Sequence, residues 1–162
     1  MHAETINYCI QCGAGLGHEI KFGKLRPTCP ACGWIYFADP KVAAAVLIEK
    51  EDLVLLARRS MEPAKGQWTL PVGFVDAGED PQDAACRECL EETGLTIQIS
   101  GLLDVIYGLE HPRGAHIVLF YRGEIVAGEI KPGDDVDKVA FFSRDDLPTL
   151  AFSTTKKILK LK

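Results

Sequence analysis

Short apolar segments separated by polar turns make up most of the chain after residue 40. Val42–Ile48 is an unbroken apolar run rich in alanine and valine, which predicts a buried strand. Glu51 and Asp52 then form a polar turn before the apolar segment Leu53–Ala57, so a β-hairpin is expected. Further strands are predicted at Thr96–Ile99, Leu102–Tyr107, His116–Tyr121, Glu124–Val126 and Val139–Ser143. The pattern indicates a sheet as the main structural element.

Among these strands, one segment has the features of a helix. Asp80 can cap its first turn, Pro81 suits the first helical position, and Gly94 can end it in a left-handed conformation. Its predicted apolar side comprises Ala84, Ala85, Cys89 and Leu90. A second helix is expected from Ser153 to Leu159. Strands flanking two helices predict an α/β protein, an α/β/α sandwich on a mixed sheet.

The first predicted helix carries a cluster of glutamates. Glu88, Glu91 and Glu92 stand at i, i+3 and i+4, so their side chains leave the helix on one face. Like charges at this spacing repel and weaken an isolated helix. A hard divalent cation that prefers oxygen ligands, Mg²⁺ or Mn²⁺, would offset that repulsion. The cluster therefore predicts a metal site.

The residues around the glutamates also have a defined spacing. From Gly73 to Leu95 the chain follows G-x5-E-x7-R-E-U-x-E-E-x-G-U, where U is apolar. This pattern resembles the signature of the Nudix hydrolases, which cleave nucleoside diphosphates linked to another group. Cys89 stands at the first apolar position, and a buried cysteine behaves as a small hydrophobe. A solvated acidic helix would explain one charge pair, but not the glycines, the arginine and the spacing together.

The resemblance implies a metal-dependent hydrolase with the Nudix fold and assigns roles within the signature. The catalytic residues would be Glu79, Arg87, Glu88, Glu91 and Glu92. The Mg²⁺ or Mn²⁺ ligands would be the Gly73 carbonyl, Glu88, Glu91 and Glu92. Arg87 would pair with Glu79 and hold the glutamates in place, and Gly73 would let the backbone bend toward the metal. The general base can instead come from a later acidic loop, where the candidates are Glu129, Asp134 and Asp135.

Two C-x-x-C-G pairs stand near the N-terminus and have the spacing of a zinc ribbon. The predicted Zn²⁺ ligands are Cys9, Cys12, Cys29 and Cys32. The following glycines, Gly13 and Gly33, can supply the positive φ that a tight metal knuckle needs. Disulfides are the competing explanation, and reduced thiols are expected in a cytosolic chain. We therefore expect a zinc ribbon over residues 1–38 with a structural metal, and a Nudix domain over residues 39–162. Cys86 and Cys89 are expected to pack in the core.

Composition and charge narrow the class of protein. The 162 residues are 47% hydrophobic and 25% charged, with a net charge of −5. Residues 1–38 carry three Lys or Arg against two Glu, or +1, so the remainder carries −6. An acidic domain is a poor binder of polyanions, which makes nucleic acid an unlikely partner. The sequence has neither an apolar run long enough to span a membrane nor a signal peptide, so a cytoplasmic location is expected.

The substrate class follows from the wider resemblance. The chain is similar to pyrophosphatases of FAD, ADP-ribose and NADH, although Val72 replaces a common glycine and an S-Q-P-W-P-F-P-type motif is missing. We expect cleavage of such a dinucleotide into AMP and another monophosphate. The candidate substrate-binding residues are Arg58, Trp68, Tyr107 and His111. A non-catalytic Nudix sensor and an RNA 5′-end hydrolase are the alternatives. Many relatives are dimers, so a homodimer is compatible with the resemblance.

Overall fold

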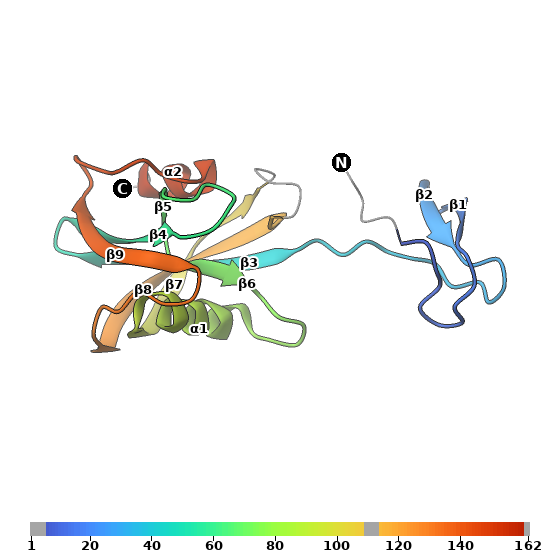
Figure 1. The fold of residues 1–162 in the computed structure, drawn as a ribbon, viewed down its shortest axis with the longest axis horizontal. Coiled ribbons are helices and arrows are strands. Elements are labelled where there is room, and N and C mark those ends of the chain that lie inside the picture. The colour runs from blue at the N-terminus through green and yellow to red at the C-terminus, as the bar shows by residue number, and fades with distance from the viewer. Residues whose placement is uncertain (1–5, 109–113, 161–162) are drawn as a thin grey trace. The chain divides into compact units, whose positions relative to one another are not determined.

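The computed structural model describes residues 6–108 and 114–160. The chain divides into two compact units, Met1–Asp39 and Pro40–Lys162. This division lies one residue from the boundary expected from the sequence. The elements of each unit are labelled in Figure 1.

The smaller unit is built on one β-hairpin. β1 (Gly17–Lys21) pairs antiparallel with β2 (Lys24–Thr28), and an isolated bridge joins Thr28 to Ile35. Among the described residues of this unit, only Cys9, Thr28 and Cys29 are buried. The unit therefore has no apolar core that could stabilise it, and another source of stability is required.

The larger unit contains a seven-stranded sheet. Its strands are β3 (Val42–Lys50), β4 (Leu53–Arg59), β5 (Trp68–Thr69), β6 (Val72–Phe74), β7 (Leu95–Tyr107), β8 (Ile117–Gly128) and β9 (Val136–Ser143). The order is β5-β4-β3-β8-β7, with β6 paired to β3 and β9 paired to β4. β3 and β8 run parallel, whereas the other pairs are antiparallel. The predicted mixed sheet is confirmed.

Two helices cover opposite faces of this sheet, as Figure 1 shows. α1 (Pro81–Thr93) packs Ala84 and Ala85 against Ala44 of β3, whereas α2 (Ser153–Lys160) packs against the face that carries Ala43 and Ala45. Adjacent residues of a strand point to opposite faces, so alternate alanines of β3 lie on the α1 side and on the α2 side of the sheet. The predicted α/β/α sandwich is confirmed. Within the described part of the chain, neither helix has the length and hydrophobicity that a transmembrane span requires.

Two details differ from the expectations. The strands predicted separately around Gly101 and Gly123 are continuous in β7 and β8, because register shifts near Gly101 absorb the irregularity without a turn. Leu90, expected on the apolar side of α1, is half exposed. Thr93 and Glu92 occupy buried positions on that helix instead.

β3 and β4 separate beyond their hairpin. They are paired only at Glu49–Val54 and Lys50–Leu53, and the other end of β3 pairs with β6. The remainder of β4 pairs with β5 and β9. One end of the sheet is thus open between β3 and β4, and the cavity described below is lined from both strands.

Candidate active site

The position of α1 follows from its ends. The Asp80 side chain accepts a hydrogen bond from the Gln82 N–H at 2.8 Å, and Pro81 takes the first helical position. At the other end, Gly94 has φ +74° and its N–H donates to the Leu90 carbonyl. Both predicted caps are confirmed. They fix the helix with its glutamates beside β6.

Gly73 is required because the Glu88 carboxylate lies against it. A Cβ built at Gly73 would lie 1.8 Å from Cδ of Glu88, a distance no real side chain tolerates. Gly73 is not among the glycines with positive φ, and it pairs with Ala44 in the sheet. Space for the Glu88 carboxylate is the reason for glycine that the structure shows.

Arg87 holds together the acidic residues of the signature. Its Nε and Nη2 donate to the two carboxylate oxygens of Glu79 at 2.8 and 2.9 Å, which confirms the predicted pair. Its Nη1 donates to Glu88 at 2.7 Å and to Glu91 at 3.3 Å, and Nη2 also donates to the Phe74 carbonyl. The hydrogen bonds from Arg87 and the Asp76 N–H lower the pKa of Glu79 to about 2. Glu79 is therefore an anion at neutral pH and orients Arg87.

Glu92 differs from the other two helix glutamates because it is buried. It is 2% exposed, and one carboxylate oxygen accepts a hydrogen bond from the Val72 N–H at 3.1 Å. Burial raises the pKa of Glu92 well above its ordinary value, and the charges of Asp135 and Glu88 act in the same direction. Burial also raises the pKa of Glu88, although Arg87 opposes this shift. The site concentrates negative charge in a partly desolvated place.

Three carboxylates meet at the entrance to this site. Glu88, Glu91 and Asp134 each offer an oxygen, and these atoms lie within 4.8 Å of one another. Such a set of hard oxygen donors fits Mg²⁺ or Mn²⁺. Asp134 comes from the loop before β9, which sequence spacing alone could not bring to α1. The other two loop candidates are not part of this group of three: Asp135 lines the same cavity but faces Arg59 at 3.7 Å, and the Glu129 carbonyl adjoins Gly94.

A cavity of about 500 Å³ extends from the carboxylates into the sheet. Its acidic part is lined by Asp76, Glu88, Glu92, Asp134 and Asp135, with Arg87 beside them. Its apolar part is lined by Ala43, Ala45, Ala115, Val118, Phe120 and Phe152. Thr69 and Thr155 also line it, and their hydroxyls lie 3.1 Å apart. The volume is within the range of small-molecule sites, and the lining combines charged, polar and apolar side chains.

The candidate substrate-binding residues are only partly near this cavity. Arg58 is not among its lining residues and forms a two-point ion pair with Asp137 at 2.7 and 3.2 Å. Trp68 is buried in the core, with its ring 4.6 Å from that of Phe142 in an edge-on contact. Tyr107 ends β7 with an exposed side chain, and His111 lies outside the described residues. The structure thus does not bring Arg58, Trp68 or Tyr107 into the cavity wall.

The sequence analysis missed Arg59, which lines the cavity. Its side chain donates to the Pro63 carbonyl at 2.8 Å, lies 3.7 Å from Asp135, and stands over the Phe152 ring at 5.4 Å. The two neighbours have different surroundings, because the β4–β9 ladder shifts register between Arg58 and Arg59, and Arg58 pairs with Asp137 whereas Arg59 lines the cavity. Without knowledge of which face bears the cavity, the sequence had no signal that selected Arg59.

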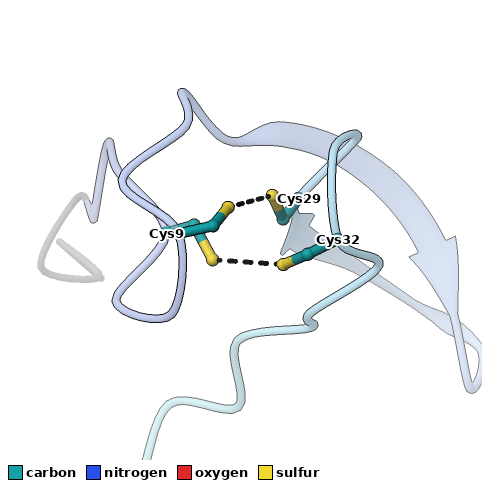
Figure 2. Close-up of side chains that lie close together, drawn as sticks. Cys9, Cys29 and Cys32 are labelled. Atoms are coloured by element: carbon teal, nitrogen blue, oxygen red, sulfur yellow. Dashed lines mark hydrogen bonds between the residues drawn. The ribbon is translucent and has the colours of Figure 1, made fainter.

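The four N-terminal cysteines converge in the smaller unit, and Figure 2 labels Cys9, Cys29 and Cys32 among them. Sγ of Cys9 lies 3.6 Å from Sγ of Cys32, and Sγ of Cys12 lies 3.5 Å from Sγ of Cys29. A tetrahedral zinc with Zn–S bonds of about 2.3 Å would separate its sulfurs by about 3.8 Å, so the cluster fits Zn²⁺. The backbone N–H of Cys32 lowers the pKa of the Cys29 thiol to about 6, although burial opposes it, whereas burial and the neighbouring thiols raise the pKa of Cys32.

The two halves of this cluster have the same backbone construction. Gly13 and Gly33 have φ of +75° and +78°, as predicted, and their N–H groups donate to the carbonyls of Cys9 and Cys29 at 2.9 Å. None of the six cysteines forms a disulfide. The pairs are therefore two equivalent knuckles that face a common centre.

Comparison with known proteins agrees with this geometry. The family model of the NUDIX domain matches residues 39–161, which include the sheet, α1 and the cavity. The chain belongs to the Nudix family. The match confirms the predicted family and the prediction that the chain is a Nudix enzyme.

Individual relatives extend the comparison. The chain is 40% identical to the ADP-ribose pyrophosphatase of Methanocaldococcus jannaschii over 123 residues, which cover 75% of this chain and 73% of that protein. It is 34% identical over 144 residues to the NAD-capped RNA hydrolase NudC of Pseudomonas aeruginosa, or 88% of this chain and 50% of that protein. It thus spans about half the length of this NudC relative.

One solved structure resembles nearly the whole chain. The crystal structure of a NUDIX hydrolase from Nitrosomonas europaea has a TM-score of 0.85 and 32% identity. The match covers 96% of this chain and 89% of that one. The similarity therefore extends over the cysteine-bearing unit as well as the Nudix domain.

Proposed function

We propose that the protein hydrolyses the pyrophosphate bond of an adenine nucleotide in which the diphosphate carries a second group, ADP-ribose first among them. One observation carries the proposal: Glu88 and Asp134, two members of the Glu88–Glu91–Asp134 carboxylate group, line a cavity large enough for a nucleotide. Oxygen ligands suit a metal-bound diphosphate, and the apolar lining residues suit a base or sugar.

The side chains have distinct proposed roles. Glu88, Glu91, Asp134 and the Gly73 carbonyl would hold Mg²⁺ or Mn²⁺, which when bound neutralises phosphate charge and activates a water molecule. Arg87 is a positioning residue, because its hydrogen bonds fix Glu88 and Glu91 while Glu79 fixes Arg87. Glu92, oriented by the Val72 N–H and bordering the cavity, is our candidate for the group that accepts the water proton.

ADP-ribose is favoured among the substrates by the similarity to the ADP-ribose pyrophosphatase of M. jannaschii. FAD and NADH share the adenosine diphosphate and differ in the second group. Arg59 and Phe152 are the residues of the cavity that we propose contact a phosphate and a ring, because a cation and an aromatic face stand together there.

The deciding experiment is a substrate panel with product analysis. Purified protein with Mg²⁺ is incubated separately with ADP-ribose, FAD, NADH and a dNTP, and the products are separated by chromatography. The proposal expects AMP and ribose 5-phosphate from ADP-ribose, with the highest kcat/KM in the set. Binding of ADP-ribose without turnover would instead identify a sensor and contradict the proposal.

A second candidate is hydrolysis at the 5′ end of NAD-capped RNA. It is favoured by the 34% identity to NudC over 144 residues, a span longer than the Nudix domain. A capped RNA oligonucleotide in the same panel separates the two candidates. If its kcat/KM exceeds that of ADP-ribose, the RNA end is the preferred substrate.

We further propose that residues 1–38 form a zinc ribbon with a structural Zn²⁺ on Cys9, Cys12, Cys29 and Cys32, and that residues 39–162 form the catalytic domain. The fit of the sulfur distances to a tetrahedral metal supports this proposal. Four thiolates leave zinc no open position, so its role would be to hold the fold. We propose a cytoplasmic location, and a homodimer is compatible with the family resemblance. Light scattering of the purified protein tests the oligomeric state.

A further inference from the structure

The β1–β2 hairpin of the ribbon has an unusual surface. Its large apolar side chains face solvent: Ile20, Phe22 and Leu25 are 71%, 77% and 64% exposed. Phe37, which follows the cysteine knuckles, is also exposed. Large exposed apolar groups gathered on a small unit indicate an interaction surface.

Strand register divides these side chains between two faces. In an antiparallel pair, residues opposite each other point to the same side, and the side alternates along the strand. Lys21 pairs with Lys24 and Glu19 pairs with Arg26, so these four residues share one face. Ile20 pairs with Leu25 and His18 with Pro27 on the other face. One face thus gathers all three cations of the ribbon.

Aromatic rings join that cationic side. The Arg26 guanidinium stands over the Phe37 ring at 4.6 Å, and the Phe37 and Phe22 ring centres are 6.0 Å apart. Lys21 pairs with Glu19 at 2.9 Å, so one negative charge offsets part of the positive charge. We call the set Lys21, Phe22, Lys24, Arg26 and Phe37 the cationic face.

Phe22 occupies a position that its side chain disfavours. Phe22 and Gly23 form the hairpin turn, with φ of +51° and +75°. Glycine and asparagine adopt the left-handed region readily, whereas a bulky residue there is strained. Its exposed aromatic ring contributes little to the packing of the unit and is accessible to a ligand.

We propose that the cationic face binds single-stranded nucleic acid, with a base stacked on Phe22 and phosphates contacted by Lys21, Lys24 and Arg26. Single-strand sites combine aromatic platforms with cations that follow the phosphate chain, and both are present here. The opposite face, with Ile20 and Leu25, lacks cations and takes no part. The proposal concerns the ribbon and does not depend on hydrolysis by the Nudix domain.

The low average charge of the ribbon does not argue against this site. The sequence expectation that nucleic acid is an unlikely partner rested on a net charge of +1 over residues 1–38, which ignores how the charges are placed. The cysteines lie near the other end of the hairpin, since Thr28 precedes Cys29 while Lys24 begins β2. Lys24 lies four residue steps from Thr28, or about 13 Å, which exceeds a Debye length of about 8 Å at physiological salt. Arg26 lies closer to the cysteines, two steps from Thr28.

Fluorescence anisotropy of the zinc-loaded full chain tests the proposal. The probes are labelled oligo(U) and oligo(dT) of about 10 nucleotides, each with a 5′-hydroxyl, in buffer without Mg²⁺. Such ends offer the Nudix cavity no pyrophosphate. Binding should weaken about tenfold or more between about 50 and about 200 mM salt, since three cations displace counterions from the strand. Absence of binding at low salt with both probes would overturn the proposal.

Three variants assign the binding to this face. Phe22→Asn should weaken binding about tenfold with zinc content and thermal midpoint unchanged or raised, because asparagine suits the turn. Phe22→Tyr keeps a ring and should bind as the wild type does. Ile20→Thr, on the opposite face, should leave binding unchanged. Equal binding by the Phe22→Asn variant would overturn the proposal. The proposal would also be overturned if the chain binds neither probe but self-associates, and if Ile20→Thr abolishes that self-association. The partner of this hairpin would then be a second copy of the chain.

Discussion

The carboxylate of Glu88 occupies the space that a side chain at Gly73 would fill. A Cβ at Gly73 would lie 1.8 Å from Cδ of Glu88 and 2.1 Å from each of its oxygens. Strand β6 and helix α1 therefore approach so closely that only glycine fits. The metal cluster depends on this contact, because Glu88 is one of its three carboxylates.

Gly73→Ala should consequently displace Glu88 and leave the fold intact. A shift of about 1 Å in a catalytic group can lower a rate about a hundredfold, so a loss of this order in kcat/KM is expected. The control is Gly101→Ala, because a Cβ there meets no atom within 4 Å. Steady-state hydrolysis and circular dichroism of both variants check this. Activity retained in the Gly73→Ala variant would contradict the proposed role of Glu88.

Much of the site could be predicted from the sequence. The features that could not be predicted depend on how segments distant in the chain come together. The caps of α1 and the Glu79–Arg87 pair depend on residues close in the chain, so local spacing was sufficient. Asp134 joins Glu88 only through the path of the β8–β9 loop, which no local pattern encodes. Arg59 rather than Arg58 faces the cavity because β4 separates from β3, and a single strand does not reveal which of its faces will border a cavity.

Glu92→Gln tests the buried carboxylate. The amide oxygen of glutamine can still accept the Val72 N–H, so the strand–helix contact should remain. Turnover should fall at least about a hundredfold if the carboxylate accepts a proton, while the thermal midpoint stays the same or rises. Glu92→Ala should unfold more easily, because a buried N–H left without a partner costs about 1–3 kcal/mol. Wild-type turnover by the Glu92→Gln variant would exclude Glu92 as the base.

Loss of zinc should affect the ribbon and spare the Nudix domain. Because only Cys9, Thr28 and Cys29 are buried among the described residues of the ribbon, the metal must supply most of its stability. Structural zinc in small domains contributes about 10–16 kcal/mol of apparent binding free energy. Cys29→Ser should lower the zinc content, measured by mass spectrometry, from about one ion per chain toward zero. Its effect on the ribbon should appear as rapid proteolysis before residue 40.

The matched control for zinc loss is Cys86→Ser. Cys86 lies on α1 with its sulfur 3.8 Å from the Ile97 carbonyl, so it is distant in sequence and outside the cysteine cluster. This variant should retain zinc and an intact ribbon. Equal zinc content in the Cys29→Ser and wild-type proteins would contradict the four-cysteine site.

The Glu79–Arg87 pair predicts how stability depends on pH. The folded-state pKa of Glu79 is about 2, below its ordinary value of about 4.3. The pair therefore stabilises the folded state above about pH 4.3, and this contribution is lost as the pH falls toward about 2. The thermal midpoint of Glu79→Gln should lie below that of the wild type at about pH 7, and the difference should shrink by about pH 3. Glu124→Gln, at an exposed position of β8, is the control. A difference that persists unchanged at low pH would contradict the ionic origin of the stabilisation.

The neighbouring arginines of β4 provide a direct test of the cavity. Arg59 lines it beside Phe152 and Asp135, whereas Arg58 pairs with Asp137 outside it. If Arg59 contacts a substrate phosphate, Arg59→Ala should lower kcat/KM about tenfold to a hundredfold, mainly through a higher KM. Arg59→Lys should recover part of the loss, since lysine keeps the charge but not the planar donor geometry. Arg58→Ala should leave KM unchanged, because its partner, Asp137, belongs to the protein itself.

Steady-state kinetics with ADP-ribose and Mg²⁺ measures all three variants. A larger effect on KM from Arg58→Ala than from Arg59→Ala would place the substrate on the other side of β4.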